Sequence, residues 1–389
     1  MHSGQLVFSQ VVGRVPHYQF QRLVERLDAS SRRQRFSPWE HFLTLVFAQL
    51  TYRESLRDIE ACLGSRPELA YHLGFRHPVR RSTLADANEQ RDWRLFAAVA
   101  QGLMQRARKL YVDEPLGLEI AHELYALDAS MIDLSLALCP WGNWTGTDSA
   151  VKLHALLDLR GCLPAFVAIT AAEYPDVAVL DAVPVVPGSF YIMDRGYVDL
   201  RRLRRLQQGG AFFVIRAKAN FRYYVSASRP VDKLSGVRSD QSIRFRGRHT
   251  PAAWTDTMRR VSVYDQAQHR RLILWTNHWR LSAHLVGELY RQRWQVELFF
   301  RWIKQNLRLR CFFGLSPNAV RVQLWSAISA YLLVAIARKE LGVTLSLQKI
   351  LQIISVNIFE PIPLHQLLTS FDTRNDFITP PEQLLFNDL

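Results

Sequence analysis

The stretch SFYIMDRGYVDLRRLRRLQQGGAFFVIRAK, residues 189–218, contains two apolar runs on either side of a basic segment with regularly spaced leucines. The apolar runs are rich in β-branched and aromatic residues, which is typical of buried strands. The segment between them, DLRRLRRLQQGG, predicts a helix that ends at its two glycines. A strand, a helix and another strand in this order predict part of an α/β sheet.

Further runs with strand composition lie on both sides of this stretch. ELYALDAS, VKLHALLDL and PAFVAIT begin at residues 123, 151 and 164, and RLILWTN begins at residue 271. Strands in series, followed by strand and helix in alternation, predict a mixed α/β sheet. The residues at about 219–270 are rich in Arg, Ser and Gly and alternate weakly, so we interpret them as an insertion into the sheet domain.

The first third of the chain has helical patterns. SPWE, residues 37–40, predicts a capping box, with Ser37 as N-cap and Glu40 at the third helical position. A further helix is expected from about Leu84 to Tyr111. We expect an N-terminal helical domain over residues 1–112, a sheet domain over 113–340, and a C-terminal helical or irregular segment over 341–389.

Composition limits the kinds of partner. The 389 residues include 49 Lys or Arg and 35 Asp or Glu, which gives a net charge of +14 and a pI near 9.9. This charge favours a polyanionic partner, with nucleic acid first and an anionic membrane surface second. A basic enzyme without a nucleic-acid partner is the alternative that charge leaves open.

Cysteines and apolar runs argue against several classes of protein. The four cysteines, Cys62, Cys139, Cys162 and Cys311, form no C-x-x-C pair. We therefore expect neither a disulfide framework nor a zinc ribbon, and a reducing cytosol fits. No signal peptide is predicted at the N-terminus. The longest apolar run, residues 324–337, is too short to span a bilayer and predicts a buried helix, so no membrane partner is expected.

The stretch SAHLVGELYRQRWQVELFFRWIKQNL, which begins at residue 282, predicts one long helix because it contains a single Gly and no Pro. Because successive residues of a helix are about 100° apart, five residues fall within an arc of roughly 80° on the helix surface, and they include one acid and three bases. The members of this arc are Tyr290, Arg293, Glu297, Arg301 and Lys304. A separate apolar stripe is expected to pack on the sheet: Leu289, Val296, Phe299, Phe300, Ile303 and Leu307. A helix with i,i+4 salt bridges, each worth about 0.3–0.5 kcal/mol, would explain the arc without any function.

Two acids at strand positions favour a functional interpretation of Glu297. Asp128 follows the alternating run LYAL, and Asp194 ends the apolar run FYIM. In such sheets, ligands bind at the carboxyl ends of strands. Either acid alone is more often a turn former or a helix N-cap. Three carboxylates together could hold the divalent ions of a phosphoryl-transfer site, with nearby bases on the phosphates.

The chain resembles bacterial insertion-sequence transposases of the Insertion Sequence 4 family. The spacing of Tyr290, Arg293, Glu297 and Lys304 is similar to the signature of that family, and Asp128 in LDAS and Asp194 in MDRGY match its two catalytic aspartates. The similarity extends to the N-terminal helical region and so covers nearly the whole chain. One departure is Pro175-Asp176, where relatives tend to carry His-Asp.

The resemblance implies an RNase H-like mixed sheet with flanking helices, a mainly β insertion before the last catalytic helix, and an N-terminal helical domain. It implies an Asp-Asp-Glu triad that holds two Mg²⁺ ions per site, with Mn²⁺ as a substitute. The implied activity is that of an endonuclease and DNA transposase, which cleaves the terminal inverted repeats of a mobile element and transfers them to target DNA. The implied partners are double-stranded DNA and a second copy of the chain in a synaptic complex, in the bacterial cytoplasm and on the nucleoid when bound.

The resemblance also indicates DNA contacts. Arg293 and Lys304 are expected to hold phosphates and Tyr290 to add a hydrogen bond, with Arg301 and Arg195 as further contacts. Trp294 or Trp275 could stack on a flipped base, although core packing is the better explanation for either tryptophan. Further arginines are candidates for phosphate contacts, near residues 76–81, 201–205 and 244–248.

Two rival functions stay open at this point. One is a non-catalytic DNA-binding regulator or a decayed transposase, and the other is a nuclease of similar fold that transfers no strand. The chain has no H-E-x-x-H, G-x-x-x-x-G-K-[ST] or G-x-S-x-G motif, which argues against zinc proteases, P-loop nucleotide hydrolases and serine hydrolases.

Overall fold

The computed structural model describes residues 4–27, 35–118, 120–134, 150–246, 254–266, 269–306, 312–314 and 316–375. The chain forms two compact units. The helical unit comprises Met1–Leu110, Leu136–Leu138 and Trp302–Leu389, and the sheet unit comprises Tyr111–Ser135 and Cys139–Arg301. Cys139, Leu307, Cys311 and Arg248, which figured in the sequence analysis, lie outside the described residues.

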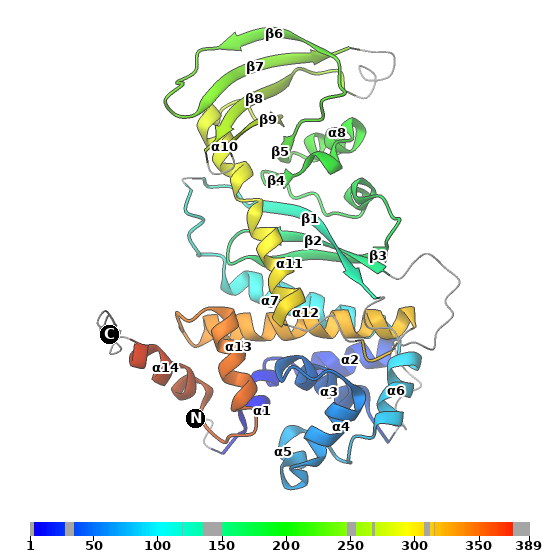
Figure 1. Cartoon of the computed structure of the whole chain (residues 1–389). Coiled ribbons are helices and arrows are strands. Elements are labelled where there is room, and N and C mark those ends of the chain that lie inside the picture. The colour runs from blue at the N-terminus through cyan, green and yellow to red at the C-terminus, as the bar shows by residue number, and fades with distance from the viewer. Residues whose placement is uncertain are drawn as a thin grey trace, which may run out of the picture. The chain divides into compact units, whose positions relative to one another are not determined.

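The sheet unit begins with five strands in the order β3-β2-β1-β4-β5 (Figure 1). Their bounds are β1 Leu124–Asp133, β2 Ala150–Asp158, β3 Leu163–Ala171, β4 Phe190–Met193 and β5 Phe212–Arg216. β1, β2 and β3 pair antiparallel, whereas β1, β4 and β5 pair parallel. This is the mixed RNase H-like sheet that was expected, and each strand coincides with a run of strand composition.

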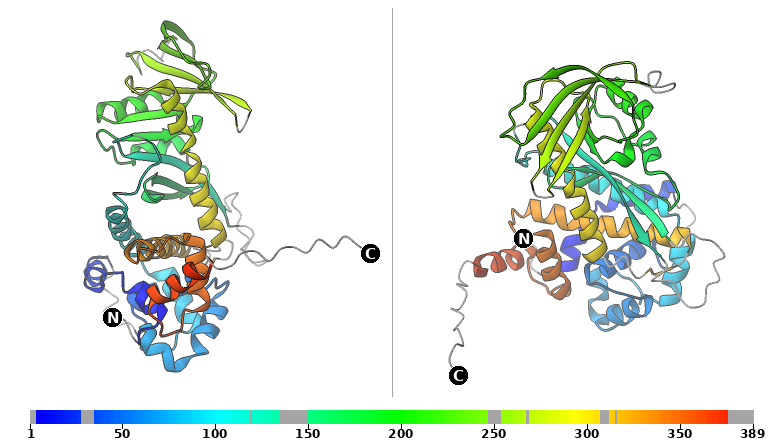
Figure 2. Two further views of the ribbon diagram at one scale, coloured as in Figure 1. Left: turned by 90° about the vertical axis from the view of Figure 1, so that its left-hand side faces the viewer. Right: turned by 45° about the horizontal axis from the view of Figure 1, so that its top comes forward.

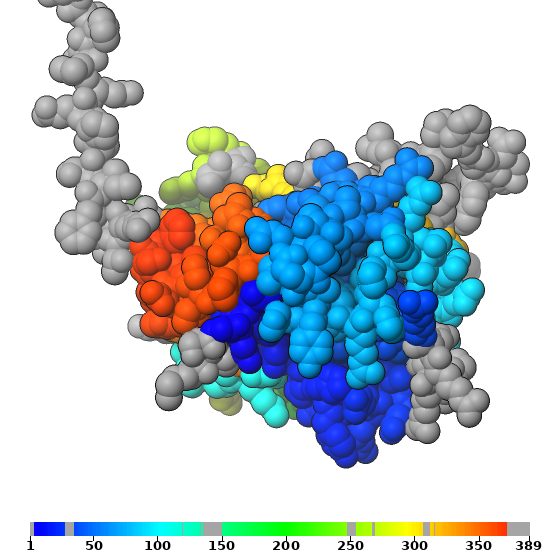
Figure 3. All heavy atoms as spheres, turned by 90° about the horizontal axis from the view of Figure 1, so that it is seen from below, coloured from blue at the N-terminus to red at the C-terminus, as the bar shows by residue number. Residues whose placement is uncertain are grey.

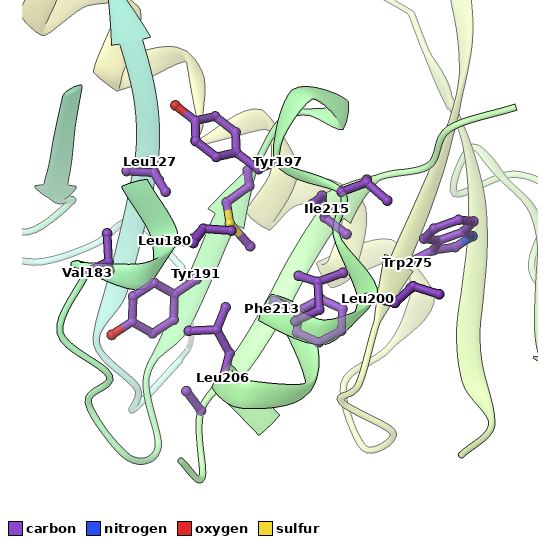
Figure 4. Close-up of a cluster of buried hydrophobic side chains, with 14 of the residues drawn as sticks. Leu127, Leu180, Val183, Tyr191, Tyr197, Leu200, Leu206, Phe213, Ile215 and Trp275 are labelled. Carbon is purple, nitrogen blue, oxygen red and sulfur yellow. The ribbon is translucent and has the colours of Figure 1, made fainter. Parts of the chain in front are cut away.

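One face of these strands is covered by a short crossover helix. α8, Leu200–Gln208, connects β4 to β5, begins at the N-cap Asp199 and buries its three spaced leucines. Those leucines join a hydrophobic cluster with residues of β1, β4 and β5 (Figure 4). The pattern DLRRLRRLQQGG thus forms the predicted helix, because burial of one apolar stripe on a sheet stabilises an otherwise charged segment.

The insertion is mainly β, as expected, and it continues the same sheet. The order after β5 is β9-β8-β7-β6, all antiparallel. The bounds are β6 Tyr223–Arg229, β7 Val237–Phe245, β8 Met258–Asp265 and β9 Arg270–Thr276. β9 pairs with β5, so the strand that ends the insertion joins it to the RNase H-like strands. Figure 2 shows the insertion strands, green to yellow-green, in two further views.

The predicted long helix is wrong in one respect: it is interrupted. α10, Ala283–Arg291, and α11, Trp294–Asn306, are separated by Gln292 and Arg293. Around the interruption, backbone N–H groups bond three residues back, as from Arg293 to Tyr290 at 3.1 Å and from Val296 to Arg293 at 3.1 Å. Such tight turns within a helix accompany strain or function. The described members of the apolar stripe are nevertheless buried: Leu289, Val296, Phe299, Phe300 and Ile303.

The helical unit packs around one long helix. α12, Pro317–Glu340, is buried against α7 and α3. Its other helices are α1 Val7–Val12, α2 His17–Leu27, α3 Pro38–Leu50, α4 Leu56–Gly64, α5 Ala70–Leu73, α6 Arg81–Gln90, α7 Trp93–Leu110, α13 Leu347–Val356 and α14 Leu364–Asn375. Figure 3 shows a face to which α1 to α6, dark blue to cyan, and α13 and α14, orange to red, contribute.

Two expectations about this unit need correction. The helix expected from Leu84 to Tyr111 is two helices, because the chain is extended at Arg91 between α6 and α7. α12 is longer than the apolar run 324–337 and could cross a membrane by length and hydropathy, but 94% of its apolar window is buried inside the structure. By its contacts α12 belongs to the helical unit, and the expected domain boundary at residue 340 stays a prediction.

The predicted capping box is confirmed, and its glutamate also accepts a hydrogen bond from a second segment of the chain. The Glu40 carboxylate is 3% exposed and accepts hydrogen bonds from the backbone N–H of Ser37 at 2.8 Å and of Arg76 at 2.9 Å. It therefore joins the start of α3 to the segment between α5 and α6.

We expect Glu40→Ala to lower the free energy of unfolding by about 2–3 kcal/mol, because two backbone donors lose their partner. Glu60→Ala is the matched control, since Glu60 forms only a 3.5 Å salt bridge with the exposed Arg80. Its cost should stay within about 1 kcal/mol. Urea unfolding of both variants measures the difference, and equal costs would contradict the role of Glu40.

Candidate active site

Asp128 and Asp194 lie side by side on the sheet. β1 and β4 are parallel neighbours, and their last paired residues are Leu127 and Met193. Both of these side chains enter the hydrophobic cluster. Because successive side chains of a strand alternate between faces, Asp128 and Asp194 emerge together on the opposite face. α10 packs on β4 and β5.

Arg293 joins Glu297 to the first of these acids. Its Nη1 donates to Asp128 Oδ2 at 2.7 Å and its Nη2 donates to Glu297 Oε1 at 2.5 Å. The Arg293 side chain is only 16% exposed. One half-buried guanidinium thus bridges a strand carboxylate and a helix carboxylate, and the tight turn between α10 and α11 is where this arginine lies.

Asp194 has its own partners from the same region. The Tyr290 hydroxyl donates to Asp194 Oδ1 at 3.1 Å, and Arg216 Nη1 lies 3.9 Å from the same oxygen. Tyr290 is 5% exposed, so only its hydroxyl end belongs to the charged side of the helix on which it was expected. The structure therefore gathers Asp128, Asp194 and Glu297 around Tyr290 and Arg293.

The charges of the site act on one another. Burial raises the pKa of the Asp128 carboxyl, with the neighbouring Glu297 and Asp194 charges adding to the rise, although Arg293 opposes it. Burial alone would lower the pKa of Arg293, but Asp128, Tyr290 and Glu297 together leave that pKa raised. Burial and the Asp194 charge raise the pKa of Tyr290 to about 12, so its phenol stays protonated and donates.

In the part of the chain that the structure describes, the remaining predicted residues form no hydrogen bond or ion pair with the three acids. Arg195 is exposed in the turn Arg195–Tyr197, and Trp294 is 46% exposed with the Arg301 guanidinium over its ring at 5.7 Å. Lys304 lies in the last turn of α11, where burial lowers its pKa. These positions leave the three basic side chains on or near the surface.

Trp275 lies in the core, as the favoured explanation had it. It is fully buried and packs at 5.0 Å from the ring of Phe245 and at 5.3 Å from that of Phe221. It therefore has no face for a base, and the core-packing alternative is right for this tryptophan. The reason is its place in β9, whose Trp275 faces the hydrophobic cluster.

Sequence reasoning missed two side chains and a cavity. Arg216 ends the run FFVIR that was assigned to a strand, and Tyr197 lies three residues after Asp194 in the motif MDRGY. A cavity of about 370 Å³ adjoins the site and is lined in part by Tyr290, Arg293 and Trp294. Its other walls include Arg270 and Arg291, two residues that had no assigned role.

The three carboxylates of the site are chemically suited to bind divalent ions. Carboxylate oxygens are the ligands that Mg²⁺ prefers in proteins. Within the described part of the chain, however, no three His, Cys, Asp or Glu side chains form a group that could hold one ion. Arg293 explains this, because its guanidinium takes the space between Asp128 and Glu297. Entry of an ion requires Arg293 to release at least one of them.

Comparison with known proteins gives the family. The profile described as "Transposase DDE domain" matches residues 120–333, which contain all three acids. The chain belongs to the DDE transposase family. A second profile, "Domain of unknown function (DUF4372)", matches residues 3–76.

Relatives of this DDE transposase chain are named as insertion-sequence transposases. A Sinorhizobium fredii protein named as transposase y4zB is 31% identical over 281 residues, which are 71% of this chain and 77% of the relative. A Geobacillus stearothermophilus protein named as the transposase for insertion sequence element IS5377 is 32% identical over 54% of this chain and 55% of the relative.

A solved structure of the piggyBac transposase synaptic complex with hairpin DNA aligns with 98% of this chain and 83% of that chain, at 10% identity and a TM-score of 0.45. Membership of the Insertion Sequence 4 family in particular stays a prediction.

Proposed function

We propose that the protein binds the terminal inverted repeats of an insertion sequence, cleaves the element ends and transfers them to target DNA. The observation that carries this proposal is the gathering of three carboxylates. Asp128 and Asp194 are neighbours on parallel strands, and Glu297 is joined to Asp128 through one arginine. Membership of the DDE transposase family supports the same chemistry.

In this proposal, Asp128, Asp194 and Glu297 hold two Mg²⁺ ions, or Mn²⁺ as a substitute. When bound, the ions would lower the pKa of the attacking water and neutralise charge on the scissile phosphate. Cleavage breaks the P–O3′ bond at the element end and leaves a 3′-OH. That hydroxyl then attacks a target phosphorus and displaces the target's own 3′ oxygen, so the number of phosphodiester bonds is conserved in the second step.

The basic residues contact phosphates in this scheme. Arg293 exchanges its carboxylate partners for phosphate oxygens, to which a guanidinium can donate two parallel hydrogen bonds. Tyr290 adds a hydrogen bond from its hydroxyl. Lys304, Arg301 and Arg195 supply positive charge further along the backbone.

Trp294 is the stacking candidate that fits this scheme. Its ring is 46% exposed and already carries the Arg301 guanidinium on one side. It also lines the cavity next to Arg293. A base out of the duplex could stack on this ring, as exposed aromatic side chains do in single-strand binding.

The proposed partners follow from the need to hold two DNA ends together during transposition. Their synapsis requires at least two copies of the chain. The N-terminal helices over residues 1–112 are proposed to bind DNA, since Arg76, Arg80 and Arg81 are exposed there. We place the protein in the bacterial cytoplasm and on the nucleoid when bound.

The test uses the full chain, Mg²⁺ and linear DNA that carries the inverted repeats flanking the gene. We expect nicks at the element ends and, with added plasmid, joined products. Cleavage without joining would indicate the nuclease alternative. Binding without cleavage would indicate the regulator or a decayed element. Either result would contradict the proposed transposition.

A further inference from the structure

Tyr197 carries a hydroxyl group that the fold itself does not use. The residue lies in the turn after Asp194, and its backbone N–H donates to the Asp194 carbonyl at 3.1 Å. Its ring is part of the hydrophobic cluster, and the whole residue is 2% exposed. Figure 4 shows the Tyr197 oxygen directed away from the other labelled side chains.

The Tyr197 hydroxyl oxygen is buried and has no hydrogen-bond partner among the described residues. Buried polar groups in folded proteins are nearly always hydrogen-bonded, so each exception calls for an explanation. An unpaired buried hydroxyl costs stability, on the order of 1–3 kcal/mol. Retaining it in an otherwise apolar cluster therefore suggests a partner that arrives in the working state.

Position and charge together point to the partner. Tyr197 shares its cluster with Leu127 and Met193, which directly precede Asp128 and Asp194 and pair with each other across β1 and β4. Burial raises the pKa of Tyr197 far above its ordinary value, and the next largest cause is the Asp128 charge, followed by Asp176 and Asp194. The phenol therefore stays protonated and can donate. Asp128 already uses Oδ1 to accept from the Ala129 N–H at 2.9 Å and Oδ2 to accept from Arg293.

We infer that Tyr197 is a positioning residue, whose hydroxyl donates to the Asp128 carboxylate once Arg293 has released it and thereby fixes that carboxylate for a divalent ion. The inference rests on the proposed function. Hydrogen-bond donors that orient metal-ligating carboxylates typically contribute 10–100-fold to metal affinity. Tyr197 suits this role because a phenol with a raised pKa stays protonated and can therefore donate a hydrogen bond to a carboxylate.

The same hydrophobic cluster contains a matched control. Tyr191 is fully buried, and its hydroxyl donates to the Pro184 carbonyl at 2.6 Å and accepts from the Val186 N–H at 3.0 Å. The Tyr191 hydroxyl thus serves the fold. Tyr197→Phe and Tyr191→Phe remove the same atom from the same cluster, one unpaired and one paired.

The experiment measures Mn²⁺ binding to the DNA-free full chain by calorimetry, and thermal unfolding in EDTA. We expect Tyr197→Phe to weaken Mn²⁺ binding by about 10–100-fold and to leave the unfolding temperature unchanged or raised. Tyr191→Phe should lower the unfolding temperature and leave Mn²⁺ binding unchanged.

Two results would overturn the inference while the proposed function stands. One is wild-type Mn²⁺ affinity in Tyr197→Phe, and the other is a loss of stability equal to that of Tyr191→Phe. If the wild-type chain binds no Mn²⁺ at all, both the inference and the proposed metal site are wrong.

Discussion

Asp128→Asn is expected to lose Mg²⁺-dependent cleavage of the element ends and, at the same time, to gain stability in the metal-free state at neutral pH. Loss of one carboxylate ligand removes several kcal/mol of charge stabilisation at the reacting phosphate, which is at least about a thousandfold in rate. DNA binding should persist, because the surface arginines and lysines are unchanged. Gel-based cleavage and binding assays measure both effects.

The gain in stability follows from the direction in which folding shifts the pKa of Asp128. Burial raises the pKa of this carboxyl in the folded protein. The unfolded chain therefore ionises at a lower pH than the folded protein, so the charge opposes folding above the folded-state pKa. Below the unfolded-state pKa both states are protonated and this opposition is absent. The variant should thus be more stable than the wild type at pH 7 and lose that advantage in acid.

Asp181→Asn is the matched control for this experiment. Asp181 is 59% exposed, and its hydrogen bonds with Arg202 lower its pKa, the opposite direction to Asp128. This variant should keep cleavage and gain no stability at pH 7. A stabilised Asp181→Asn, or an Asp128→Asn that still cleaves, would contradict the assignment of Asp128.

Arg293→Gln is expected to destabilise the metal-free protein by about 2 kcal/mol, because two half-buried carboxylates lose their charged donor. Mg²⁺ should then stabilise the variant more than it stabilises the wild type, since no guanidinium competes for Asp128 and Glu297. Cleavage should still fall, because the same side chain is proposed to contact phosphate. Thermal unfolding across a Mg²⁺ titration separates the two effects.

Arg202→Gln is the control for Arg293. Arg202 also bridges two acids, Asp181 at 2.7 Å and Asp199 at 3.0 Å, but on the surface. Exposed pairs contribute at most about 1 kcal/mol each, and Mg²⁺ should not affect this variant specifically. An Arg293→Gln protein that responds to Mg²⁺ no more than Arg202→Gln would show that Arg293 does not compete with ions.

The sequence could predict the strands and the acids because each depends on local composition. FYIM and LYAL are apolar runs that a sheet must bury, and the residue after each run emerges at the point where the two strands lie in register. The one-sided charge of 290–304 likewise follows from its spacing. The same local reasoning found the capping box at Ser37 and Glu40.

The features that the sequence could not predict depend on tertiary contacts. The turn at Gln292 and Arg293 has no Gly or Pro to signal it, and it accompanies a salt bridge to a residue 165 positions away. Trp275 was a stacking candidate like Trp294, yet it lies on β9 and faces the core. The unpaired hydroxyl of Tyr197 depends on every neighbour of that side chain, none of which is local.

The most direct test of the shared carboxylate site is a crystal structure of the complex with cleaved inverted-repeat DNA and Mn²⁺, with anomalous scattering used to locate the ions. We predict two Mn²⁺ peaks within ligand distance of the carboxylates of Asp128, Asp194 and Glu297, with Arg293 moved onto a phosphate. Manganese bound elsewhere, with Arg293 still bridging Asp128 and Glu297, would contradict the account.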